Sequence, residues 1–164
     1  MRFILLAALM LMSIPAFNQK YHLLGNGKGK GFALAAVAGA SKGVCDALSH
    51  QPGVYGKSRF VKPDSWRNKY RNGDPAQGPA FPGATHVFVA TTDLWHLSDL
   101  VRITSSLGSG VVVTRATFKQ NPKPPKWHHI VDLAVMGLCH QVTFNLVYNV
   151  SRRKPLVFGW TMKF

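Results

Sequence analysis

Three residues in the segment DLWHLSDL, positions 93–100, could do chemistry together. Asp93, His96 and Asp99 follow one another at steps of three residues. On a helix this spacing places the three side chains on one face, and the large apolar residues between them cover the rest of the surface. The arrangement is unusual because the chain has only six acidic residues, all of them aspartate.

Aspartate and histidine also lie one helical turn apart elsewhere in the chain. Asp46 comes four residues before His50, and Asp132 follows His129 by three. Four of the six aspartates therefore have a histidine within one turn. His140 follows His129 by eleven residues, so the two would lie on nearly the same face of a helix.

A metal site is one interpretation of these pairs. If the helices pack so that the pairs converge, imidazole nitrogens and carboxylate oxygens would form a mixed ligand set that suits zinc, manganese or non-haem iron. The spacing is similar to that in di-iron carboxylate bundles, although those use glutamate, which this chain lacks. The candidate ligands are Asp46, His50, Asp93, His96, His129, Asp132 and His140.

The alternative interpretation is structural. Each aspartate would then orient its neighbouring histidine or pair with a nearby cation, as Asp46 could with Lys42 and Asp99 with Arg102. A nucleophilic enzyme is disfavoured, because no serine or threonine stands in a signature such as G-x-S-x-G.

The charge balance indicates an anionic partner. The chain carries 20 Lys and Arg, and its formal net charge is +14. Lipid headgroups, nucleic acid and acidic polysaccharide would all be attracted to it. The cations are dispersed, and no zinc-finger, RNP or phosphate-loop motif is present. The Gly/Lys stretch at 18–31 lacks the Gly-Lys-Ser/Thr ending, so we interpret it as a basic linker.

A long polar loop is expected at 51–80, where proline and glycine are frequent. Aromatic residues alternate with cations there, which suits a membrane–water interface and also suits stacking on nucleic-acid bases. We expect seven of these side chains to contact lipid or a partner, namely Tyr55, Arg59, Trp66, Arg67, Lys69, Tyr70 and Arg71.

The apolar segments predict a mainly α protein. Helices are expected at 32–50, 84–103 and 127–154. The β-branched first half of 84–103 could instead begin as a strand, and 108–118 could be a strand or a short helix. Gly39 and Gly43 form a small-residue face of the kind that packs closely in membranes. We predict a small helical bundle embedded in a membrane with two to four spans. A periplasmic or surface protein with a buried helical core is the competing interpretation, because the mean hydropathy is only +0.02.

Residues 1–17 have the layout of a signal peptide, with one arginine, a short apolar run and Pro15. The segment could be cleaved or retained as an anchor helix, and 18–164 would form one helical domain. We expect Cys45 and Cys139 to be free thiols, although a disulfide between them stays open.

The central block 66–97 resembles small uncharacterised membrane-associated proteins of Bacteroidetes bacteria and their phages. The matching strings are WRNKY at 66–70, NGDPA at 72–76 and the TD-x-WH step at 92–96. The resemblance implies a bacterial envelope or a phage membrane as the setting, and it supplies no catalytic residue.

Three functions are compatible with the sequence. The chain could be a structural or accessory subunit of a membrane assembly, contacting anionic lipid through its basic loops. It could instead be a metal-binding protein or a metal-dependent enzyme that uses the Asp–His pairs. The third possibility is a nucleic-acid-associated phage membrane protein.

Overall fold

Three long helices form the body of the protein. The computed structural model describes residues 21–51, 54–56 and 58–152, so the signal-like segment 1–17 lies outside it. The helices are α3 (Lys28–His50), α4 (Leu94–Gln120) and α5 (Lys126–Ser151). Within the described ranges the only β pairing is an isolated bridge between Tyr70 and Pro79. The prediction of a mainly α protein is therefore confirmed.

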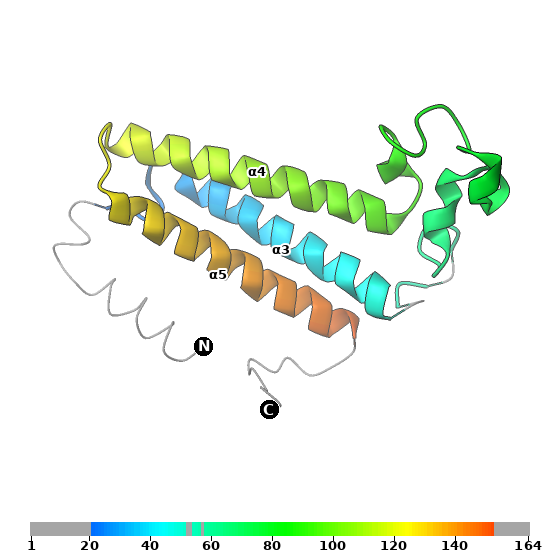
Figure 1. Cartoon of the computed structure of the whole chain (residues 1–164). Helices are drawn as coiled ribbons and strands as arrows, with labels where there is room; N and C mark the ends of the chain where they lie inside the picture. Colours follow the sequence, from blue (N-terminus) through cyan, green and yellow to red (C-terminus); the bar gives the residue numbers. More distant parts are fainter. Residues whose placement is uncertain (1–20, 52–53, 57, 153–164) are drawn as a thin grey trace.

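Helix α3 lies between the other two helices (Figure 1). It packs along both α4 and α5, whereas α4 and α5 contact each other only slightly. The expected helices 32–50 and 127–154 correspond to α3 and α5. Helix α3 also extends back to Lys28, so the stretch that we interpreted as a linker is partly helical.

Small residues let α3 approach α5 closely. A Cβ atom on Gly43 would lie 3.0 Å from the Phe144 carbonyl oxygen, and one on Gly39 would overlap the carbonyl group of His140. Thr143 adds a hydrogen bond across the same contact, from its hydroxyl to the Ala36 carbonyl at 2.7 Å. The glycine face expected from the sequence is thus where these two helices meet.

Helix α4 differs from the sequence prediction. The single helix 94–120 replaces the expected helix 84–103 and the separate element at 108–118. The segment before Leu94 forms turns, including the short 3-10 helix η5 (Val89–Thr91). The glycines at 108 and 110 do not break the helix, because Ser109 between them is buried and donates a hydrogen bond to the Gly31 carbonyl at 2.7 Å.

Helix α4 buries mainly small side chains and exposes several large apolar ones. On the inner face of α4 the buried residues are mostly Ser, Thr and Ala, while its outer face exposes Leu100, Ile103, Leu107 and Val111. Helix α5 likewise exposes large apolar residues along its length. Small residues inside and large apolar residues outside are typical of helices that pack within a bilayer.

Among the described residues, two helical segments are long and apolar enough to cross a membrane, Gly25–His50 and Lys126–Ser151. Each has 26 residues, which corresponds to about 39 Å of helix against a hydrocarbon core of about 30 Å. Only 6% of the most apolar window of α5 is buried inside the protein, compared with 44% for the segment that contains α3. These features are weak evidence of membrane association.

The segment between α3 and α4 is irregular, as expected for 51–80. It contains short 3-10 turns, namely η2 (Ser65–Lys69), η3 (Arg71–Gly73) and η4 (Pro75–Gln77), and η1 (Gly25–Gly27) precedes α3. Asn68 fastens the segment by donating to the carbonyls of Arg59 and Thr92, at 2.8 and 2.9 Å. Figure 1 places this segment at the end of the bundle where α4 begins.

Candidate functional site

The Asp93–His96 pair forms the start of α4. Asp93 is the N-cap residue, and its carboxylate accepts a hydrogen bond from the His96 backbone N–H at 3.0 Å. The other carboxylate oxygen lies 2.6 Å from His96 Nδ1 and accepts from the Thr92 hydroxyl at 2.9 Å. The three-residue spacing therefore serves a helix cap, and the same carboxylate fixes the orientation of the imidazole ring.

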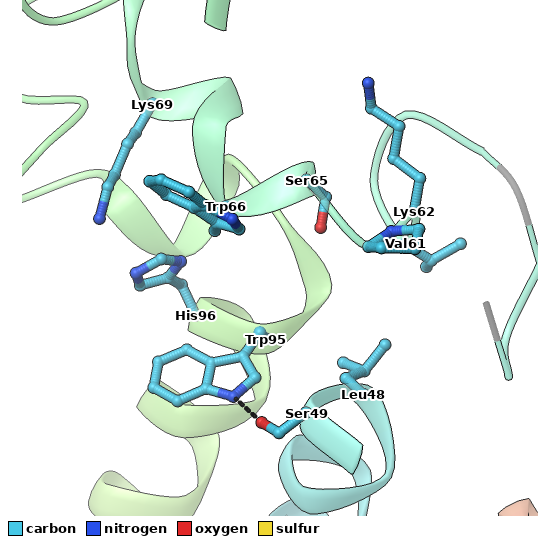
Figure 2. Close-up of a pocket in the computed structure, with 10 residues that line it drawn as sticks. Leu48, Ser49, Val61, Lys62, Ser65, Trp66, Lys69, Trp95 and His96 are labelled. Atoms are coloured by element: carbon cyan, nitrogen blue, oxygen red, sulfur yellow. Dashed lines mark hydrogen bonds between the residues drawn. The ribbon is translucent and has the colours of Figure 1, made fainter. Parts of the chain in front are cut away.

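A pocket of about 400 Å³ lies beside His96 (Figure 2). Its walls come from the end of α3 at Leu48 and Ser49, from the loop segment 61–69, and from Trp95 and His96 at the start of α4. The pocket thus joins three parts of the chain that are distant in sequence. This volume is in the usual range for sites that hold a small ligand or a headgroup.

Two tryptophans shape this pocket. Trp95 donates its indole N–H to the Ser49 hydroxyl at 3.1 Å and stands edge-on to the His96 ring, with centroids 5.1 Å apart. Trp66 lies on the other side of His96 in Figure 2, and the Arg67 guanidinium is 5.2 Å from the centroid of its indole ring. The imidazole therefore packs against Trp95, and Trp66 forms another wall of the same pocket.

The charged groups of the pocket are cationic. Lys62 pairs with Asp64 at 3.2 Å and extends away from His96, and this pairing holds the pKa of the Asp64 carboxyl below its usual value. Lys69 lines the pocket and pairs with no carboxylate of the described residues. No acidic residue lines the pocket, so the arrangement favours an anion.

A second polar cluster lies at the opposite end of the bundle. The Asp132 carboxylate accepts hydrogen bonds from Tyr21, from Lys28 at 3.0 Å, and from Thr117 at 2.5 Å. The Lys28 ammonium also lies 4.0 Å from the centre of the Tyr21 ring. Lys28 is completely buried, and Asp132 is 3% exposed. These contacts connect α3, α4 and α5 through one carboxylate.

The surroundings of Tyr21 keep its hydroxyl protonated. Burial, and then the hydrogen bond to Asp132, raise the pKa of Tyr21 well above its ordinary value. The neighbouring His128 is 1% exposed, and its ring packs against the rings of both Tyr21 and Trp127, which also contact each other. Neither ring nitrogen of His128 has a hydrogen-bond partner in the part of the chain that is described.

The remaining candidate metal ligands stay apart. Asp46 pairs with Lys42, and Asp99, which is outside the candidate set, pairs with Arg102 at 2.7 Å. Among residues 21–51, 54–56 and 58–152, no group of three or more His, Cys, Asp or Glu side chains is placed to hold a metal ion. The expected convergence of Asp46, His50, Asp93, His96, His129, Asp132 and His140 is thus not found there. The physical reason is that each pair is used within its own helix or in a separate ion pair.

The histidines outside the pocket have other neighbours. The His50 ring is exposed and stands edge-on to Tyr148, at 6.4 Å between centroids. His129 lies 5.7 Å from the Phe118 ring by the same measure. The side chain of His140 is half-buried, and its carbonyl is the one that faces Gly39.

The seven residues expected to contact lipid have three kinds of surroundings. Trp66 and Lys69 line the pocket, and Arg67 and Tyr70 pack against them. Tyr55 shares a hydrogen bond with Ser151 at the end of α5. Arg59 and Arg71 are exposed.

Asp74 stabilises a turn, because its carboxylate accepts a hydrogen bond from the Ala76 N–H at 3.0 Å.

Several important residues were missed at the sequence level. Lys28 lies in the Gly/Lys stretch expected to be a linker, yet it continues the buried helical period of Gly31, Phe32 and Ala35. Trp95 was treated only as apolar covering for the Asp–His face, yet it forms a pocket wall. Extending the period of α3 by one turn toward the N-terminus would have identified Lys28 as an inward cation.

Cys45 and Cys139 are free thiols, as expected.

Comparison with known proteins finds no matching family model, no similar curated protein and no similar solved structure. The resemblance of block 66–97 therefore stays a prediction.

Proposed function

We propose that this chain is a small membrane-embedded structural or accessory subunit that contacts anionic lipid through the segment between α3 and α4. The observation that carries the proposal is the large apolar surface that α4 and α5 turn outward. Small and hydroxyl side chains fill the inside of α4, and Leu107, Ile130 and Leu133 are exposed by 67%, 66% and 66%. Water would oppose this arrangement, whereas lipid tails favour it.

The charges fit the same proposal. Lys28 is buried and paired, and Lys42 and Arg102 also have aspartate partners. Pairing of this kind lowers the cost of placing ionisable groups near the hydrocarbon. The exposed cations Arg59, Arg67 and Arg71 lie in the loop region at one end of the bundle, where a negatively charged leaflet surface would attract them.

The proposed role is structural rather than catalytic. The two exposed apolar faces of α4 and α5 would be covered by lipid or by other subunits of a membrane assembly. A bacterial envelope or a phage membrane is the setting that the resemblance of block 66–97 suggests.

Membrane fractionation of the full chain tests this proposal. An embedded protein stays in the membrane pellet during extraction with alkaline carbonate and high salt, and is released only by detergent. Lipid that co-purifies with the detergent-solubilised protein should be richer in anionic species than the bulk membrane. Release by carbonate would overturn the membrane-embedded assignment.

A further inference from the structure

We infer that the pocket between Trp66, Trp95, Lys69 and His96 is a specific binding site for the phosphate of one anionic lipid headgroup. This inference rests on the proposed function, and it adds a defined site and ligand to a general attraction by basic loops. The other loop cations, such as Arg71, are exposed on the surface outside the pocket.

The donors in the pocket suit a phosphate group. Asp93 holds His96 Nδ1 at 2.6 Å and so fixes the orientation of the ring. The Nε2 atom has no hydrogen-bond partner among the described residues and is available to a ligand. The Lys69 side chain lines the same pocket as this ring (Figure 2), and its ammonium lies 5.5 Å from the centre of the Tyr70 ring. An ammonium group without a carboxylate partner, beside an oriented imidazole, provides two donors for phosphate oxygens when the imidazole is protonated.

The walls of the pocket suit the rest of a lipid headgroup. Trp66 and Trp95 are 42% and 37% exposed, and such amphipathic rings are enriched at the level of lipid headgroups. The pocket also lies where α3 ends and α4 begins, which is the expected membrane surface if α3 spans the bilayer. A lipid could therefore place its headgroup in the pocket while its acyl chains follow the exposed apolar face of α4.

The positions of the other aspartates strengthen the choice of an anion. Asp93 is fully buried behind His96, and Asp64 is paired with Lys62. Neither carboxylate lines the pocket, so an entering phosphate would meet no negative charge at its wall. Zwitterionic phosphatidylcholine would fit less well, because its quaternary ammonium would lie near Lys69.

The test uses the full chain in a neutral detergent and a short-chain phosphatidylglycerol as the probe. Two of the four tryptophans line the pocket, so their emission should report binding directly. We expect saturable binding that is about tenfold weaker in Lys69→Gln, because one charge-assisted hydrogen bond is lost. The matched control is Arg71→Gln, which removes one charge from the same loop outside the pocket and should weaken binding less than about twofold.

Three outcomes would overturn the inference. Equal weakening in Lys69→Gln and Arg71→Gln would mean a diffuse electrostatic attraction without a site. Equal binding of short-chain phosphatidylcholine, or of inorganic phosphate alone, would remove the anionic lipid as the ligand. Single-stranded DNA that binds more tightly than the lipid, and depends on Lys69, would assign the pocket to nucleic acid. In the first case carbonate-resistant membrane insertion would persist, so the proposed function would stand without the pocket.

His96→Gln provides a second, independent variant. The glutamine side chain still donates a hydrogen bond but carries no charge and is not held by Asp93, so we expect binding to weaken several-fold with unchanged membrane insertion. Unaltered binding would show that the imidazole does not touch the ligand.

Discussion

Lys28 and Asp132 are separated by 104 positions in the chain, yet the lysine ammonium lies 3.0 Å from the aspartate carboxylate. Thr117 reaches the same carboxylate from α4. Since α4 and α5 otherwise contact each other little, this buried ion pair is the point at which all three helices are joined.

Asp132→Asn should strongly destabilise the bundle. The amide is similar in shape, but it leaves the buried Lys28 charge without a counter-ion, which typically costs about 3–5 kcal/mol. Thermal unfolding of the detergent-solubilised chain, followed by circular dichroism, measures the effect. The matched control is Asp46→Asn, whose partner Lys42 is 41% exposed and whose loss should cost less than about 1 kcal/mol.

Removing both charges of the Lys28–Asp132 pair tests whether an isolated charge causes the destabilisation. Lys28→Met combined with Asp132→Asn should be more stable than Asp132→Asn alone, because no isolated charge remains. If the double variant is no better than the single one, the ion pair does not account for the destabilisation.

Tyr21 should resist deprotonation in alkaline solution. Its pKa in the folded state is raised above the ordinary value of 10.0, so the folded chain keeps a proton that the unfolded chain loses. The stability from this group is therefore complete below about pH 10 and decreases as the pH rises further. Phenolate absorbance at about pH 11 should be the same in the wild type and in Tyr21→Phe. A smaller signal in the variant would contradict the buried environment.

Two glycines in the bundle should respond oppositely to alanine. Gly39→Ala should cost about 1–3 kcal/mol, because its new methyl group would overlap the His140 carbonyl. Gly137→Ala meets no atom within 4 Å and should stabilise helix α5 by up to about 1 kcal/mol. Melting temperatures of the two variants provide the comparison, and equal effects would argue against close packing of α3 on α5.

Asp93 can be tested as a helix cap separately from its contact with the His96 ring. Asp93→Ala removes the acceptor of the His96 N–H and should cost about 1–2 kcal/mol. Asp93→Asn retains a capping oxygen, so the loss in stability should be smaller, while the orientation of the ring is no longer fixed by a carboxylate. If alanine and asparagine lower the melting temperature equally, the capping hydrogen bond is not the source of the effect.

The sequence predicted α3 and α5 well because each is a long apolar run with clear boundaries. The expected helix 84–103 begins about ten residues before α4, because the β-branched stretch fits either a helix or a strand and the apolar pattern does not single out Asp93 as the cap. Its continuation through Gly108 and Gly110 depends on packing against α3, which no local pattern reveals.

The candidate site was predicted only in parts. Trp66, Lys69 and His96 were all named, but they were assigned to two different sites, a lipid surface and a metal centre. Their proximity depends on the way Asn68 ties the loop to Thr92, which is a contact between residues 24 apart. The sequence does not predict the pairing of Asp132 with Lys28 for a similar reason, because the two residues are 104 positions apart.

The membrane-embedded assignment is tested most directly by measuring whether lipid or water covers the exposed apolar residues of α4 and α5. Spin labels would be attached to single cysteines at Leu107 and Leu133, with Ser109 as the buried control, in a chain whose native cysteines are replaced by alanine. In lipid vesicles, the account predicts that labels at Leu107 and Leu133 are relaxed by oxygen, which dissolves in lipid, and not by a water-soluble nickel complex. Strong relaxation of both labels by the nickel complex would place these faces in water and contradict the membrane-embedded assignment.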